Sequence, residues 1–165
     1  MSLEQKINNL ETDLHIMGTL VLDSLVGAVR ALEDKDTLKA SEVMDKDDEI
    51  DDAYMKIDQD WFELMATEQP VASDLRLSTS ILQASLHLER LGDLSVYLGK
   101  TTHEIHDLPI PESLHKIVVE MGDMVIDMAS SALESLKNRD AELALSTARK
   151  DELINSLYNK MLNEV

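Results

Sequence analysis

The sequence predicts an all-α protein of five helices, and composition, apolar spacing and an internal repeat all support this prediction. The 165 residues include only five glycines and three prolines, and only 3% are aromatic. Leu, Ala, Glu, Asp, Lys and Met dominate, and this composition favours helix over strand. No stretch alternates apolar and polar β-formers between turns. We therefore expect a helical protein with an aliphatic, methionine-rich core.

The chain repeats itself at a distance of 104 positions, measured from Met17 to Met121. Residues 17–61 align without a gap on residues 121–165, and many aligned positions are identical. An ungapped register of this length predicts two copies of one structural unit. The second copy stops early, because residues 62–106 have no counterpart in the sequence.

Apolar residues recur every three or four positions in the first part of the chain, which is typical of helices with one buried stripe. A first helix is expected over about residues 3–33, with Ser2 as its N-cap. A second continuous helix is expected over about residues 37–68, ending before Pro70. Pro70 suits the first turn of a long third helix that reaches about residue 106.

The linker that follows, residues 107–111, contains two prolines. A fourth helix is expected over about residues 111–138, and a fifth from about residue 140 to the C-terminus. We predict a first three-helix bundle over residues 1–107 and a partial second repeat of two helices over residues 108–165. Two helices leave bare the face that a third would cover. We therefore expect either a partner chain over that face, giving a homodimer, or a poorly ordered C-terminal half.

The formal net charge of −18 limits the possible partners. Such acidity argues against nucleic-acid binding and against docking on anionic lipid, but it suits cations or a basic protein surface. The chain has no cysteine, which excludes disulfides and thiolate metal sites. We find no signal peptide and no apolar run near the roughly 20 residues that span a bilayer. A soluble cytoplasmic protein is expected, with membrane contact only through protein partners.

Two acidic pairs stand where a helix would bury apolar residues. Asp47 takes a position of the apolar stripe in the second helix, and Asp51 follows one turn later on nearly the same face. Glu89 and Asp93 have the same spacing on the third helix. Carboxylates on adjacent helices of one bundle are the ligands that hard metal ions prefer. The sequence therefore predicts a metal site at Asp47, Asp51, Glu89 and Asp93.

A plainer interpretation of these acids stays open. Acidic pairs at this spacing are common in an acidic chain, and Lys46, Arg76 and Arg90 are placed to neutralise them. In the second repeat the corresponding residues are Asp151 and Asn155, so that half-site is weaker. No Ser-His-acid arrangement and no Gly-rich phosphate loop is present, and we therefore expect no enzyme.

Three motifs together closely resemble the PhoU family, the accessory and regulatory proteins of bacterial phosphate-specific transport. They read DDEID at residues 47–51, EQPVASDLR at residues 68–76 and HLERLGD at residues 87–93. The motifs stand in family order at family-like spacing. The resemblance extends from about Leu10 to the C-terminus.

The resemblance implies two pseudo-symmetric three-helix bundles in a cytoplasmic, usually dimeric protein. It implies negative regulation of phosphate uptake and of the phosphate-starvation response. The implied partners are the phosphate ABC transporter and a two-component sensor kinase. Several PhoU-like proteins bind metal clusters through an E/D-x-x-x-D motif, which Glu89 and Asp93 match. Asp47 and Asp51 match acidic positions on the preceding helix. Iron is the favoured metal, ahead of manganese, magnesium and zinc.

The resemblance is incomplete at the C-terminal end of the sequence. A second E-R-x-G-D helix of the family would fall beyond Val165, so the second repeat is expected to lack its last helix. A different class of function also stays open, namely a carboxylate-bridged metal-binding or metal-storage helical protein, or a metal-dependent hydrolase.

Overall fold

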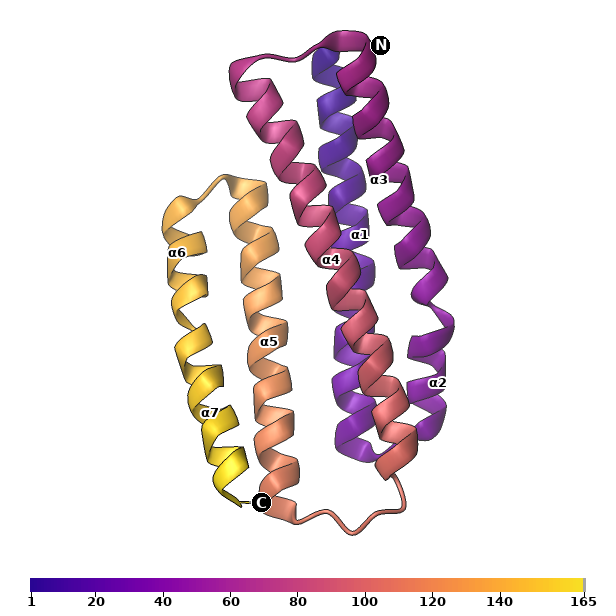
Figure 1. Ribbon diagram of the computed structural model, residues 1–165, viewed down its shortest axis with the longest axis vertical. Coiled ribbons are helices and arrows are strands. Elements are labelled where there is room, and N and C mark those ends of the chain that lie inside the picture. The colour runs from indigo at the N-terminus through magenta and orange to yellow at the C-terminus, as the bar shows by residue number, and fades with distance from the viewer. Residues whose placement is uncertain (165) are drawn as a thin grey trace.

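The computed structural model describes residues 1–164 as seven helices joined by short turns (Figure 1). The helices are α1 (Leu3–Asp34), α2 (Thr37–Asp45), α3 (Asp47–Glu68), α4 (Ala72–Ile105), α5 (Glu112–Asn138), α6 (Ala141–Arg149) and α7 (Asp151–Glu164). The all-α class is confirmed, and no strand occurs in this part of the chain. The second and fifth predicted helices are each divided in two.

These two divisions correct the prediction of continuous helices. Lys46 separates α2 from α3, and Lys150, one repeat length later, separates α6 from α7. Neither break contains Pro or Gly, so the apolar spacing gave no sign of it. Acidic residues follow each break, at positions 47–49 and 151–152. Acidic side chains favour the first turn of a new helix, because the amide groups there carry partial positive charge.

The turn before α4 also differs from the prediction, because Pro70 lies outside the helix. α3 ends at Gln69, whose φ of 46° is left-handed, and Val71 is extended before α4 begins at Ala72. Pro70 is buried within this turn. The expected cap of α1 is confirmed, since Ser2 and Gln5 form a capping box.

The first four helices form one bundle in which α1 is central. α1 packs against α2, α3 and α4, and on its other side against α5. The buried core of the bundle consists of Ile7, Leu10, Leu14, Met17, Val21, Ile50, Ile57, Leu64, Ile81 and Leu88. α1 is the only described helix long and apolar enough to cross a bilayer, with a mean hydropathy of 1.4, and half of that window is buried against neighbouring helices.

The contact between α1 and α5 is pseudo-symmetric. A Cβ atom added to Gly18 would lie 2.9 Å from Leu133 Cδ1, and one added to Gly122 would lie 2.8 Å from Val29 Cγ2. The repeat relates Gly18 to Gly122 and Val29 to Leu133. The same contact therefore occurs twice, once in each direction. This reciprocity is the property of a two-fold axis, so a half-turn relates the two repeats.

The repeat also extends to the turns that begin α2 and α6. Lys35 and Arg139 have left-handed φ values of 52° and 54°. Asp36 and Asp140 follow them as N-caps. The side chain of Asp36 accepts hydrogen bonds from two backbone N–H groups of α2, and that of Asp140 accepts one from α6. α6 and α7 pack only against α5 and each other within residues 1–164. The division at residue 107 stays a prediction, and α5 packs directly on α1.

Candidate functional site

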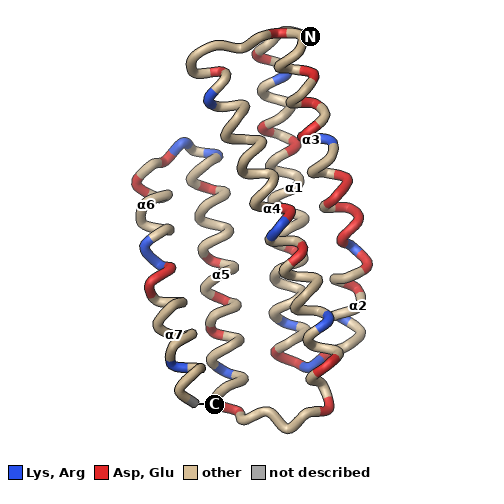
Figure 2. The backbone as a smooth tube through the Cα atoms, in the orientation of Figure 1, with Lys and Arg blue, Asp and Glu red and all other residues tan. Residues whose placement is uncertain are grey.

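The four predicted ligands surround the point where α3 and α4 approach closely. A Cβ atom added to Gly92 of α4 would lie 3.1 Å from Ile50 Cγ2 of α3. Ile50 lies within the first acidic pair and Gly92 within the second. The absence of a side chain at Gly92 thus lets the helices meet between the two pairs. Acidic positions recur along α3 (Figure 2).

Asp47 occupies the more enclosed position on α3. Burial raises the pKa of Asp47, and the negative charges of Asp51, Asp93 and Asp48 raise it further. Lys100, a residue that the sequence analysis did not single out, opposes this rise in the pKa. Asp47 is half-buried in the first turn of α3. Its carboxylate is therefore held beside other carboxylates at the positive end of a helix.

Glu89 is the corresponding half-buried acid on α4. Burial raises the pKa of Glu89, followed by the charges of Asp93, Asp51 and Asp47, while Arg90 lowers it. The acids of α3 therefore act on α4, and those of α4 act on α3. This mutual influence shows that the structure brings all four predicted side chains within electrostatic range.

None of these four carboxylates forms an ion pair within 4 Å in residues 1–164. The plainer interpretation, in which Lys46, Arg76 and Arg90 neutralise the acids, is supported only for Arg90, which acts on Glu89 without a direct ion pair. Lys100 and Arg90 compensate this charge only at longer range, and the remaining negative charge suits a cation. As the side chains stand, no three His, Asp or Glu residues of the described chain are grouped closely enough to hold one ion. Coordination would require the exposed Asp51 and Asp93 to rotate inward.

The equivalent place in the second repeat has a different chemistry. Asn155 Nδ2 donates a 2.9 Å hydrogen bond to Asp151 Oδ2. Asp151 therefore has a neutral partner where Asp47 has a second acid. Lys150, the counterpart of Lys46, pairs with Asp127 at 2.5 Å. At this place the second repeat thus has one acid, and its carboxylate already accepts a hydrogen bond.

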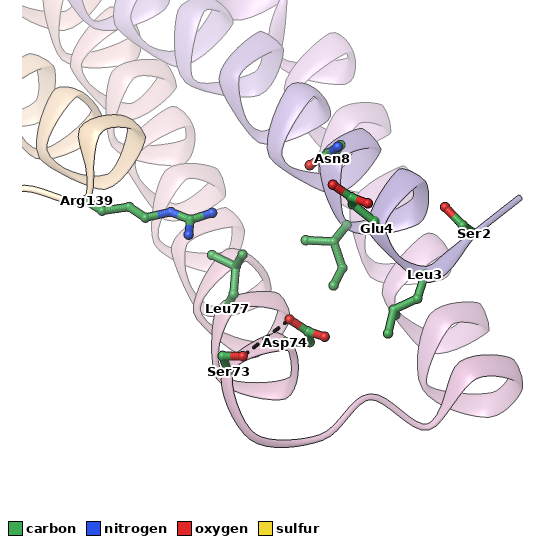
Figure 3. Close-up of a pocket in the computed structure, with 9 residues that line it drawn as sticks. Ser2, Leu3, Glu4, Asn8, Ser73, Asp74, Leu77 and Arg139 are labelled. Atoms are coloured by element: carbon green, nitrogen blue, oxygen red, sulfur yellow. Dashed lines mark hydrogen bonds between the residues drawn. The ribbon is translucent and has the colours of Figure 1, made fainter.

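A cavity of about 610 Å³ lies beside the first turns of α1 and α4, and Figure 3 shows the residues that line it. It lies between the first turns of α1 and α4 and the turn before α6, segments far apart in the sequence. Glu4, Asp74 and Arg139 all line it. Arg139 Nη2 lies 3.2 Å from Glu11 Oε1. Sequence spacing contained no signal for this cavity. Its mixed charges favour neither an anion nor a cation.

Comparison with known proteins decides the family. The family model described as the PhoU domain matches residues 14–102 and 118–165. The chain belongs to the PhoU family. A gap in the match, residues 103–117, contains the linker between α4 and α5.

Known PhoU proteins resemble the chain over nearly all of its residues. A Phosphate-specific transport system accessory protein PhoU homolog from Pseudomonas putida is 32% identical over 97% of this chain. A homologue of the same description from Clostridium acetobutylicum is 31% identical over 98%. The crystal structure of PhoU from Pseudomonas aeruginosa superposes with a TM-score of 0.95 at 31% identity. The Streptococcus pneumoniae structure gives a TM-score of 0.90 at 28% identity.

These PhoU relatives are longer than this chain. The chain spans 62% of the Pseudomonas putida protein and 74% of the Clostridium acetobutylicum protein. It covers 99% of its own length but 78% of the Pseudomonas aeruginosa structure. The fold of residues 1–164 is thus that of a part of the known PhoU structures.

Proposed function

We propose that the chain is a non-catalytic regulator of phosphate transport that acts through protein contacts. It would lower phosphate uptake and repress the phosphate-starvation response, with the phosphate ABC transporter and a two-component sensor kinase as partners. Membership of the PhoU family supports the assignment, since the named relatives are accessory proteins of phosphate-specific transport. A homodimer stays a further prediction from the resemblance.

We propose that the partner binds the acidic face of α3 and α4. This acidic face consists of Asp47, Asp51, Glu89 and Asp93, none of which forms a direct ion pair in the described chain. The whole chain has a net charge of −18. Cytoplasmic loops of membrane proteins carry an excess of Lys and Arg. A basic loop of a membrane partner would therefore be attracted to this face, and the attraction would weaken with salt.

Co-purification from phosphate-replete cells tests the proposal. The tagged chain is compared with a variant that carries Asp51→Asn and Asp93→Asn, two exposed positions whose substitution leaves the core unchanged. We expect transporter or kinase to be retained by the natural chain and reduced about tenfold for the variant. Asp52→Asn with Asp107→Asn removes the same charge elsewhere and serves as the control. Equal retention by all three proteins would contradict the role of this face.

We also propose that the same face binds a hard cation, with iron favoured. The donor chemistry fits, because four carboxylates share one region and repel one another. Asp47 and Glu89 would hold the ion from the enclosed side, and Asp51 and Asp93 would complete the set. The ion would supply positive charge that relieves the repulsion between α3 and α4.

Elemental analysis and calorimetry with Fe²⁺, Mn²⁺, Mg²⁺ and Zn²⁺ test the cation, using protein purified without chelators or a histidine tag. Asp93→Ala is expected to lower the affinity at least tenfold, and Asp151→Ala to leave it unchanged. Phosphatase turnover with these metals separates a regulator from a hydrolase. Robust turnover that disappears in Asp93→Ala would favour the hydrolase over the regulator.

A further inference from the structure

Exposed apolar side chains adjoin the acidic face on both of its helices. Met55 lies one turn after Asp51 on α3 and is 57% exposed. Leu86 lies about one turn before Glu89 on α4 and is 45% exposed. Single exposed apolar residues are normal on protein surfaces, so neither side chain alone indicates a binding site. Their shared place beside the acids distinguishes them.

The register of α3 and α4 places Met55 and Leu86 at the same level of the bundle. The two helices run antiparallel on either side of the turn at residues 69–71 (Figure 1). Ile50 of α3 meets Gly92 of α4 at their crossing. Met55 follows Ile50, and Leu86 precedes Gly92, by similar numbers of residues, so both lie about 8 Å further along the bundle. The two exposed side chains thus mark one end of the acidic face.

The apolar surface continues from this level towards the turn. Phe62 is 60% exposed, and its ring packs edge-on against Trp61 with 5.5 Å between the ring centroids. Because Phe62 lies seven residues after Met55, both side chains follow one face of α3. Leu75, near the start of α4, is 41% exposed. We call Met55, Phe62, Leu75 and Leu86 the apolar strip.

The apolar strip is exposed although the first repeat has its third helix. That helix is α4, and it packs against α1, α2 and α3 through a different face, which includes the buried Ser85 and Leu88. In the second repeat Asn159 stands at the position equivalent to Met55. The packing of the repeat therefore does not require an apolar side chain there. Exposure of the strip has a cause other than a missing third helix.

We propose that the acidic face and the apolar strip together bind one amphipathic helix of a partner protein, with Lys or Arg in its first turns and large apolar side chains in the turns that follow. The inference rests on the proposed function and specifies the chemistry of its partner. A helix of about eleven residues covers the distance from Asp51 to Phe62, about 16 Å. The helix is therefore about three turns long.

The two parts of this surface make different contributions. The four acids form no direct ion pair among residues 1–164, so they are available to a basic group and orient the incoming helix. The apolar strip adds affinity by removing apolar surface from water, and salt does not screen this contribution. A second copy of this chain has the same net charge of −18 and is repelled. Anionic lipid is repelled by the acids for the same reason.

Two helical peptides of equal charge test the proposal on the full 165-residue chain. The first has Lys in its first turns and Leu on the same face of the turns that follow, and the second has Ala in place of each Leu. Both are cross-linked on the opposite face, because short isolated helices are unstable in water. Calorimetry in EDTA measures the affinities at low and high salt. We expect the Leu peptide to bind at least about tenfold more tightly, and this ratio to persist at high salt while both affinities fall.

Variants of the chain show where the peptides bind. Met55→Gln with Leu86→Gln changes two exposed positions, leaves folding intact and should bring the affinity for the Leu peptide within about twofold of that for the Ala peptide. Ile16→Gln with Val26→Gln, two exposed apolar positions of α1, is the matched control and should keep the tenfold ratio. Asp51→Asn with Asp93→Asn should weaken the binding of both peptides.

Three results would overturn the inference. The first is equal affinity of the two peptides for the natural chain. The second is an unchanged ratio in the chain with Met55→Gln and Leu86→Gln. The third is a dimer by light scattering, or binding to phosphatidylcholine vesicles, that the same double substitution abolishes, because a second copy or a membrane would then cover the strip. Transporter or kinase retention that depends on Asp51 and Asp93 but not on Met55 and Leu86 would leave the proposed function intact and contradict this inference alone.

Discussion

The first and second repeats share residues at many positions, yet they bury them differently. Ile50 is 2% exposed in the first repeat, whereas Ile154, the same residue one repeat later, is half-buried. Val43 and Thr147, at equivalent positions of the two repeats, are buried alike at 5%. The comparison separates two contributions to the core. Contacts within a helix pair persist in both repeats, and contacts with a third helix exist only where α4 is present.

The largest expected effect is the difference in unfolding free energy between Ile50→Ala and Ile154→Ala. Ile50→Ala should lower the free energy of unfolding by about 3 kcal/mol, because a fully packed side chain leaves a cavity. Ile154→Ala should cost about 1 kcal/mol, because much of its side chain already contacts water. Urea unfolding followed by circular dichroism measures both values. Equal losses would show that a covering element protects Ile154 in solution.

The second test concerns the two halves of the α1–α5 contact. Gly122→Ala should destabilise the protein by about 1 kcal/mol net, because its Cβ meets the stiff, buried Val29, and this exceeds the gain in helix propensity. Gly18→Ala should be nearly neutral, because its Cβ meets the flexible end of Leu133. Thermal unfolding of the two single variants is the measurement. A larger loss for Gly18→Ala would contradict this account of the interface.

The smallest expected effect concerns the acids. The pKa of Asp47 is raised in the folded protein, so between the ordinary carboxyl pKa and the raised value the folded state binds more protons than the unfolded state. The unfolding free energy must then fall as pH rises through this window. Stability that is present below the ordinary pKa, about 4, is lost above the raised one.

Asp47→Asn should therefore stabilise the metal-free protein by a few tenths of a kcal/mol at pH 7 and have less effect at pH 4. Asp151→Asn, the counterpart in the second repeat, has no opposing acidic pair and should not show this pH dependence. Urea unfolding at both pH values, in EDTA and at low salt, compares the two variants. Destabilisation by Asp47→Asn at pH 7 would show that the charged carboxylate of Asp47 has a stabilising partner in the folded protein.

The sequence predicted the helical class and the pairing of the acids because both depend on local spacing. Apolar residues every three or four positions identify the buried face of a helix, whichever helix packs against it. The short turn at residues 69–71 made α3 and α4 neighbours, and Glu89 and Asp47 were therefore expected together. The N-cap at Ser2 followed from the same local chemistry.

Other features depend on contacts that spacing does not contain. The breaks at Lys46 and Lys150 have no Pro or Gly, and the placement of Pro70 before α4 depends on the left-handed Gln69. The influence of Lys100 on Asp47 requires the relative rotation of two helices. The cavity beside Arg139 joins three distant segments. None of these can be read from one helix at a time.

The half-turn that relates α1 to α5 also gives the molecule two flanks of the same fold and different chemistry. It directs α2–α3 and α6–α7 to opposite flanks (Figure 1). The flanks are not equivalent, because four interacting acids mark one and Asp151 with its amide neighbour marks the other. A basic partner is therefore expected to bind one flank in preference to the other.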